Sequence, residues 1–185
     1  MGRATCQVWS TVCRNCNAKG VVMQKTKAVL KQLAIGLLLV FILSNIISWL
    51  KKPALDSTHL PEGTVRLVDG TRYTFQTGKP LIIHFWASWC RVCKMEASNI
   101  ERLSKRYEVL SIAVNSGSDA AVKTYMKEQG LHFHVLNDVD GSWARRFKVE
   151  VFPTTFIYDA KGELRFTEVG YTTTAGLLAR VKMVE

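Results

Sequence analysis

The longest apolar stretch of the chain lies close to its N-terminus. Residues 33–50 contain no charged side chain and only three polar ones, Ser44, Asn45 and Ser48. As a helix rising about 1.5 Å per residue, this stretch would cover about 27 Å, most of a bilayer core of about 30 Å. A core helix normally keeps a polar face, whereas this stretch is apolar all round. We therefore predict a transmembrane anchor over 33–50.

The residues on either side of this stretch predict whether it is cleaved and how it is oriented in the membrane. A cleaved signal peptide ends in small residues, whereas Trp49, Leu50 and two lysines follow here, so we expect the anchor to stay uncleaved. Basic side chains are more numerous before the stretch than after it: Arg14, Lys19, Lys25, Lys27 and Lys31 against Lys51, Lys52 and Arg66. The positive-inside rule then leaves the N-terminus in the cytoplasm and the rest of the chain outside.

Beyond the anchor, the hydrophobic pattern predicts one α/β domain. Residues 51–63 contain two prolines among polar residues and are expected to be a tether, and the domain is expected over 64–185. Short apolar runs, some continuous enough for a strand buried on both faces, alternate there with amphipathic stretches of helical period. We predict strands at 65–68, 72–75, 81–87, 109–114, 132–136, 154–158 and 164–169, and helices at 91–106, 119–129, 142–147 and from about 173. This order is typical of a central mixed sheet flanked by helices.

The distribution of charge argues against a nucleic-acid-binding protein. The formal net charge is +10, from 25 basic and 15 acidic residues. Eight basic residues and no acidic one lie within residues 1–52, which leaves 17 basic against 15 acidic in the rest. The charge thus belongs to the anchor and its flanks, where it sets orientation. No nucleic-acid partner is expected.

Residues 1–32 are predicted to be a basic cytoplasmic leader. Its first 22 residues hold Cys6, Cys13 and Cys16, and Cys13-x-x-Cys16 has the form of half a zinc site without partner ligands in the same segment. Met23 opens a basic segment that leads directly into the apolar span, so translation could start there and residues 1–22 could be absent from the natural protein. The intact mass of the native protein distinguishes the two starts.

The strongest chemical signal is Cys90-Arg91-Val92-Cys93, at the point where a predicted buried strand ends and a helix begins. Two cysteines at this spacing can form a disulfide, and the field of a helix N-terminus favours the reactive thiolate of the first. A structural disulfide across so short a loop would stabilise the fold little. A zinc site would need further cysteines, and these are the only two after residue 16. Redox chemistry is the favoured interpretation.

Two segments carry a resemblance to a known family. FWASWCRVCK, followed some sixty residues later by VFPTTFIYDAKGEL, resembles the thioredoxin superfamily over about residues 64–184. The chain is most similar to its membrane-anchored, TlpA-like bacterial branch. Within that branch the single anchor, the short domain and the tail GYTTTAGL resemble the suppressor of copper sensitivity protein D. The resemblance implies a thioredoxin-like fold and a location in the bacterial inner membrane, with the catalytic domain in the periplasm.

The resemblance also implies roles for individual residues. Cys90 would be the nucleophile and Cys93 the resolving cysteine, and Pro153 would be a cis-proline that presents backbone beside them to a partner's extended chain. His84 stands where the family often has a buried acid. It could relay a proton to or from Cys93, or simply pack within a strand. Flanking positions of the site are expected to be Trp86, Trp89, Arg91, Val92 and Phe152.

The expected activity is thiol-disulfide oxidoreduction on protein partners. No nucleotide-binding motif is present, so we expect no cofactor beyond the Cys90–Cys93 disulfide. Electrons would pass to or from another protein, and the expected donor is a membrane electron-donor protein. A reductant is preferred over an oxidase or isomerase. A second possibility is a copper-binding module for copper tolerance, with Cu(I) held by Cys90, Cys93 and Met95. His132 and His134 alternate as on one strand face, where solvation is the simpler explanation and metal binding the other.

Overall fold

The computed structural model describes residues 30–43, 46 and 58–185. The chain divides into two units, Met1–Ile47 and Ser48–Glu185. In the first unit, residues 30–43 form a helix. Within the described ranges, no helix is both long and apolar enough to cross a bilayer. The predicted anchor includes 44–45 and 47–50, which are not described. The leader up to residue 29, with its three cysteines and Met23, and the tether up to residue 57 also lie outside the described residues.

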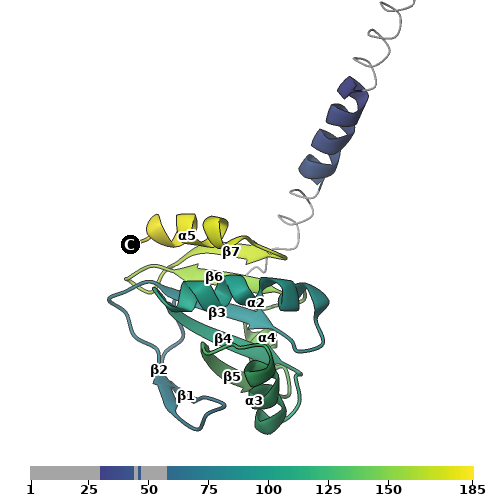
Figure 1. The fold of residues 1–185 in the computed structure, drawn as a ribbon. Helices are drawn as coiled ribbons and strands as arrows, with labels where there is room; N and C mark the ends of the chain where they lie inside the picture. The colour runs from purple at the N-terminus through teal and green to yellow at the C-terminus, as the bar shows by residue number, and fades with distance from the viewer. Residues whose placement is uncertain (1–29, 44–45, 47–57) are drawn as a thin grey trace, which may run out of the picture. The chain divides into compact units, whose positions relative to one another are not determined.

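The second unit is built on a five-stranded mixed sheet in the order β5-β4-β3-β6-β7 (Figure 1). In chain order its strands are β3 (Leu81–Trp86), β4 (Glu108–Val114), β5 (His134–Asp138), β6 (Thr154–Tyr158) and β7 (Leu164–Val169). β3 and β5 run parallel to β4, whereas β6 is antiparallel to both β3 and β7. The predicted mixed α/β sheet is confirmed, and β3 lies at its centre with all six residues buried.

Apolar side chains on the two faces of the sheet form two separate cores. The helices are α2 (Arg91–Ser104), α3 (Asp119–Glu128), α4 (Ser142–Arg146) and α5 (Thr174–Lys182). One core combines α2, α3 and α5 with alternate residues of β3 and β4, such as Ile82 and Ala113. The other combines α4 and the N-terminal hairpin with the intervening strand residues, such as Ile83 and Ile112. Successive side chains of a strand point to opposite faces of the sheet. Because each face is covered by a core, the central strands need continuous apolar runs.

The predicted hairpin forms, but as a separate two-stranded sheet of β1 (Thr64–Arg66) and β2 (Arg72–Thr74). Its strands are shorter than predicted because Leu67 turns back to accept a hydrogen bond from Gly70 and donate one to Thr71. Val68 N–H donates to the Val135 carbonyl at 2.9 Å, which ties the hairpin turn to β5.

The prediction of a strand over 132–136 was wrong by two residues, since β5 spans His134–Asp138. Pairing with β4 decides this register, from Leu110 opposite His134 to Val114 opposite Asp138. His132 lies before the strand, where its N–H donates to Glu101 Oε2 at 2.8 Å. The two histidines therefore do not alternate along one strand face.

Candidate active site

Cys90 and Cys93 form a disulfide at the junction of β3 and α2. Cys90 is the N-cap of α2, and the Cys93 backbone N–H donates to Cys90 Sγ at 3.1 Å. Both cysteines are buried, at 8% and 3% exposure, and the first turn of α2 has no acidic residue. When the pair is reduced, the Cys93 N–H and the positive end of the helix thus face Cys90 Sγ. Both favour its thiolate over its thiol.

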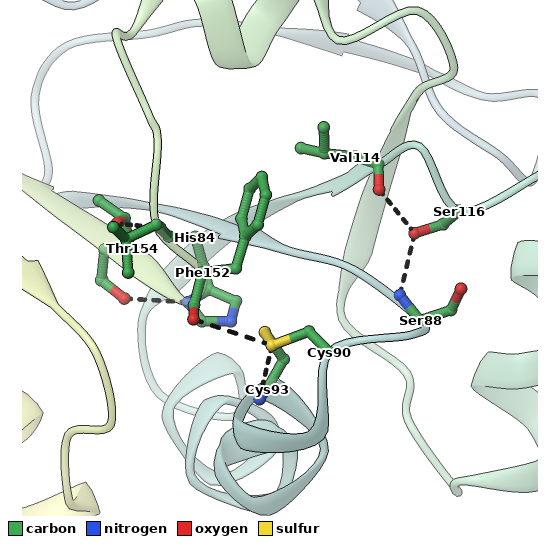
Figure 2. The surroundings of a disulfide bond; sticks show 10 residues. His84, Ser88, Cys90, Cys93, Val114, Ser116, Phe152 and Thr154 are labelled. Atoms are coloured by element: carbon green, nitrogen blue, oxygen red, sulfur yellow. Dashed lines mark hydrogen bonds between the residues drawn. A yellow bond between two sulfur atoms is a disulfide. The ribbon is translucent and has the colours of Figure 1, made fainter.

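The loop before β6 brings Phe152 and Pro153 against the cysteines from the other side. The Phe152–Pro153 peptide is cis. Cys90 Sγ lies 3.8 Å from the Phe152 carbonyl oxygen. Figure 2 marks this contact with a dashed line. The Pro153 carbonyl accepts the Gly170 N–H at 2.8 Å, so the loop after β7 lies beside the same site.

The two tryptophans of the FWASWC segment have different environments. Trp86 is buried in the core, donates its indole N–H to Ser111 Oγ at 2.7 Å and packs against Tyr125. Trp89 is 64% exposed, and its ring meets Phe152 edge-on with centroids 5.8 Å apart. Only Trp89 therefore stands at the mouth of the site, together with the exposed side chains of Arg91 and Val92 that separate the cysteines.

His84 lies beneath the cysteines in the middle of β3 and is 2% exposed. Its Nδ1 hydrogen-bonds with Thr155 Oγ1 on the neighbouring β6 at 2.9 Å, and Figure 2 shows the ring directed toward the cysteine pair. Burial lowers the pKa of His84 to about 3 because the cationic ring would lose its hydration. The histidine is therefore neutral at physiological pH and is a poor proton acceptor.

The arrangement of a disulfide at a strand–helix junction opposite a cis-proline can be compared with known proteins. The family model described as AhpC/TSA family matches residues 53–167. This chain belongs to the AhpC/TSA family. Solved structures of similar proteins have the same fold, and several of these proteins are named for thiol-disulfide exchange.

Three relatives indicate where in the AhpC/TSA family the chain lies. A thioredoxin-like protein of Haemophilus influenzae is 30% identical over 166 residues, which cover 87% of this chain and 98% of that protein. The thiol:disulfide interchange protein DsbE of the same organism is 31% identical, over 54% of this chain and 56% of that protein. A crystal structure of a thioredoxin-family thiol:disulfide interchange protein from Chlorobium tepidum matches with a TM-score of 0.62 at 30% identity, covering 69% of this chain and 95% of that one.

These findings confirm the thioredoxin-like fold and the enzyme class. This AhpC/TSA-family chain is a thiol-disulfide oxidoreductase whose Cys-x-x-Cys pair is Cys90 and Cys93. The finer resemblance to the suppressor of copper sensitivity protein D stays a prediction.

The sequence analysis missed one charged residue of this AhpC/TSA-family site. Glu96 is fully buried on α2, three residues after Cys93 on the same helix face. Its Oε1 accepts the Thr172 N–H at 2.7 Å, and its Oε2 has no hydrogen-bond partner within the described part of the chain. Burial raises the pKa of Glu96 to about 7, partly offset by the Thr172 hydrogen bond. The available signal was a carboxylate at helical spacing with Cys93, Ile100 and Leu103, the residues that form the apolar face of α2.

Asn99 extends this buried polar contact by one helical turn. Its amide nitrogen donates to the Thr172 carbonyl at 3.0 Å and to the Tyr171 hydroxyl at 3.2 Å. Its amide oxygen accepts the Thr174 hydroxyl at 2.9 Å. The tail segment GYTTT is thus hydrogen-bonded to the helix that carries the cysteines.

The side chains considered for metal binding are not gathered in one place. Across residues 30–43, 46 and 58–185, no group of three His, Cys, Asp or Glu side chains could hold a metal ion. His132 is exposed, and its Nδ1 lies 3.3 Å from Glu101 Oε1 on α2. Met95 is 65% exposed, whereas both cysteines are buried.

Proposed function

We propose that this chain exchanges disulfides with protein partners, with Cys90 as the attacking thiolate and Cys93 as the resolving thiol. The contact that carries the proposal is the Cys93 N–H donated to Cys90 Sγ at the start of α2. In the reduced protein, the Cys90 thiolate attacks one sulfur of a partner disulfide, and the other partner sulfur leaves as a thiolate. Cys93 then loses its proton and attacks Cys90 Sγ, which releases the second partner sulfur. The partner gains two electrons and the cysteine pair is left as the disulfide.

Two buried groups could accept the Cys93 proton in the second step. Glu96 has a pKa of about 7, so its carboxylate can take a proton near neutral pH and return it later. His84 is neutral but, with a pKa of about 3, holds a proton poorly. Glu96 is therefore the better acceptor, and His84 stays hydrogen-bonded to Thr155 on β6.

The preferred direction is reduction of the partner. Cys90 and Cys93 are the only cysteines after residue 16, so the domain has no structural disulfide that reducing conditions could break. The electrons that regenerate the dithiol would come from a membrane electron-donor protein, since the sequence has no nucleotide-binding motif. Oxidase or isomerase activity is the alternative, and the reduction potential separates it from reductase activity.

The proposed location is the bacterial inner membrane, with residues 33–50 as a single-pass anchor and 51–63 as the tether. The apolar composition of 33–50 and the excess of basic residues before it support this topology. In the described helix over 30–43 the large apolar side chains are exposed, for example Leu37 at 72% and Val40 at 67%. Protease added to intact spheroplasts should cleave the catalytic domain from the membrane. Protection of the domain would contradict a periplasmic location.

The activity is tested by insulin reduction with the full chain in detergent and dithiothreitol as the electron source. Cys90→Ser should abolish turnover, and Cys93→Ser should accumulate a mixed disulfide with the partner. Cys16→Ser is a matched control outside the domain and should keep full activity. Inactivity of the wild type together with tight Cu(I) uptake would instead support the copper-binding function. The equilibrium of the Cys90–Cys93 pair with glutathione then gives the direction.

A further inference from the structure

The short connection between β3 and α2 is hydrogen-bonded to the turn after β4 at two successive residues. Ser88 N–H donates to Ser116 Oγ at 3.0 Å. The Trp89 indole N–H donates to the Asn115 carbonyl at 3.1 Å. Cys90 is the next residue, so these two contacts lie immediately before the nucleophile.

Ser116 is buried, and its hydroxyl stands between two backbone groups (Figure 2). It donates to the Val114 carbonyl at 3.0 Å. A hydroxyl has a single hydrogen, so the Ser88 N–H is received by a lone pair of the same oxygen. The hydroxyl thus connects Ser88 to Val114, each of which needs a partner this close to the core.

The register of the sheet shows what this connection replaces. Trp86 is the last residue of β3 paired with β4, opposite Ala113. If the parallel ladder continued, Ser88 would lie opposite Asn115 and would donate directly to the Val114 carbonyl. The Ser116 hydroxyl occupies that position instead. It separates the loop from β4 at the point where the chain turns toward the cysteines.

The turn that carries Ser116 is itself held in place. Asn115 has a left-handed φ of +46° and donates its N–H to the Asp138 carbonyl at 3.0 Å. Trp89, held by Asn115, meets the Phe152 ring, and the Phe152 carbonyl lies 3.8 Å from Cys90 Sγ. Displacement of the loop would therefore move Cys90 relative to both Phe152 and the N–H of Cys93.

We propose that Ser116 is a positioning residue for the reaction, which acts through the Ser88 amide to hold Cys90 where the α2 N-terminus stabilises its thiolate. The role of Ser116 in the reaction rests on the proposed function. The hydrogen bonds of Ser116 do not depend on a protein partner. Without the hydroxyl, the loop either loses one anchor or closes directly onto Val114. Both changes weaken the contact of Cys90 Sγ with the first turn of α2.

The test measures alkylation of reduced Cys90 by iodoacetamide against pH in the full chain. Ser116→Ala should shift the profile toward higher pH and slow alkylation at neutral pH by about threefold or more, because the thiolate is the reacting species. Ser104→Ala is the matched control, since Ser104 Oγ also donates to a backbone carbonyl, that of Glu101, at the far end of α2. Its profile should match the wild type.

A second pair of variants separates the hydroxyl from side-chain volume. Ser116→Thr and Ser116→Val have side chains of nearly the same shape, and only the first keeps a hydroxyl. Threonine should preserve the alkylation profile and valine should shift it, which decides the question even if Ser116→Ala does not fold. An unchanged profile in folded Ser116→Ala or Ser116→Val, with only a lower melting temperature, would overturn the proposal and leave Ser116 a structural residue.

Failure of the positioning role of Ser116 and failure of disulfide exchange with proteins would give different results. Alkylation is read by mass spectrometry on the peptide that contains Cys90, which trypsin separates from Cys93 at Arg91, and it needs no protein partner. A wild type that fails to reduce insulin, yet shows the Ser116-dependent profile, would contradict disulfide exchange with proteins and retain the positioning role. Hydrogen exchange of the Ser88 amide gives an independent check. It should be protected in the wild type and at least about tenfold faster in Ser116→Val, and fast exchange in both would overturn the proposal.

Discussion

The Glu96 carboxylate accepts the backbone N–H of Thr172 at 2.7 Å, which joins the buried face of α2 to the segment between β7 and α5. This contact brings an acid from within one helical turn of Cys93 into the core and leaves its second oxygen without a partner among the described residues. A buried carboxylate is costly, and a proton relieves that cost. The site therefore combines a disulfide with a group that titrates near neutral pH.

The first prediction concerns the pH dependence of stability. Burial raises the pKa of Glu96 to about 7 in the folded protein from its ordinary value of 4.5. The folded state then binds more protons than the unfolded state between these values, so Glu96 lowers the free energy of unfolding as pH rises from about 4.5 to 7. Glu96→Gln keeps the acceptor for Thr172 and cannot ionise. It should be more stable than the wild type above pH 7, by about 3 kcal/mol.

Chemical denaturation of the oxidised protein at pH 4.5, 6 and 8 measures this effect. Glu128→Gln is the matched control, because Glu128 is an exposed carboxylate on α3. Glu96→Gln should differ from the wild type progressively more as pH rises. A constant difference at all three values would show that Glu96 does not titrate in this range.

The second prediction concerns the group that accepts the Cys93 proton. In single-turnover release of a thiol from a mixed disulfide on Cys90, Glu96→Gln should slow release at neutral pH by about tenfold or more. His84→Ala should slow it less, because the pKa of His84, about 3, keeps the ring neutral in both steps. Stopped-flow measurement of the released thiol gives both rates. Equal rates for Glu96→Gln and the wild type would remove Glu96 from the mechanism, and an unchanged rate in His84→Ala would exclude a relay through His84.

The third prediction concerns the core beneath the sheet. Ile112 is fully buried in β4, between β3 and β5. Ile112→Ala should lower the free energy of unfolding by about 2–5 kcal/mol, since it removes buried methyl groups and leaves a cavity. Val139→Ala removes methyl groups from a side chain that is 59% exposed and should cost well under about 1 kcal/mol. Urea denaturation checks both, and similar losses would contradict the assignment of the core.

The fourth prediction concerns the start of α4. Asp138 is 1% exposed, and its carboxylate accepts hydrogen bonds from the Trp143 and Ala144 N–H groups at 3.0 and 2.9 Å. Asp138→Ala leaves these donors buried without a partner and should cost about 2–4 kcal/mol. Asp140→Ala, at a carboxylate close by that is exposed, should cost less than about 1 kcal/mol. Thermal unfolding of the two variants tests this difference, which would vanish if Asp138 did not cap the helix.

Much of the fold follows from local pattern. The continuous apolar run of β3 requires burial on both faces, and the serine before α3 and the threonine before α5 accept N–H bonds from the first turns of their helices. The start of β5 was misplaced because pairing with β4 sets it. Short apolar runs do not specify their own ends when the partner strand supplies the hydrogen bonds.

The sequence by itself determined the redox pair and the α/β class, because these depend on residue type at close spacing. The tertiary structure alone decided which polar groups surround the cysteines. Glu96 meets Thr172, 76 residues later, and Ser88 meets Ser116, 28 residues later. Such contacts are set by how strands and helices pack, so the groups that tune a thiolate are absent from any local pattern. They are brought to the cysteines by the hydrogen bonds of the turn after β4 and of the segment after β7.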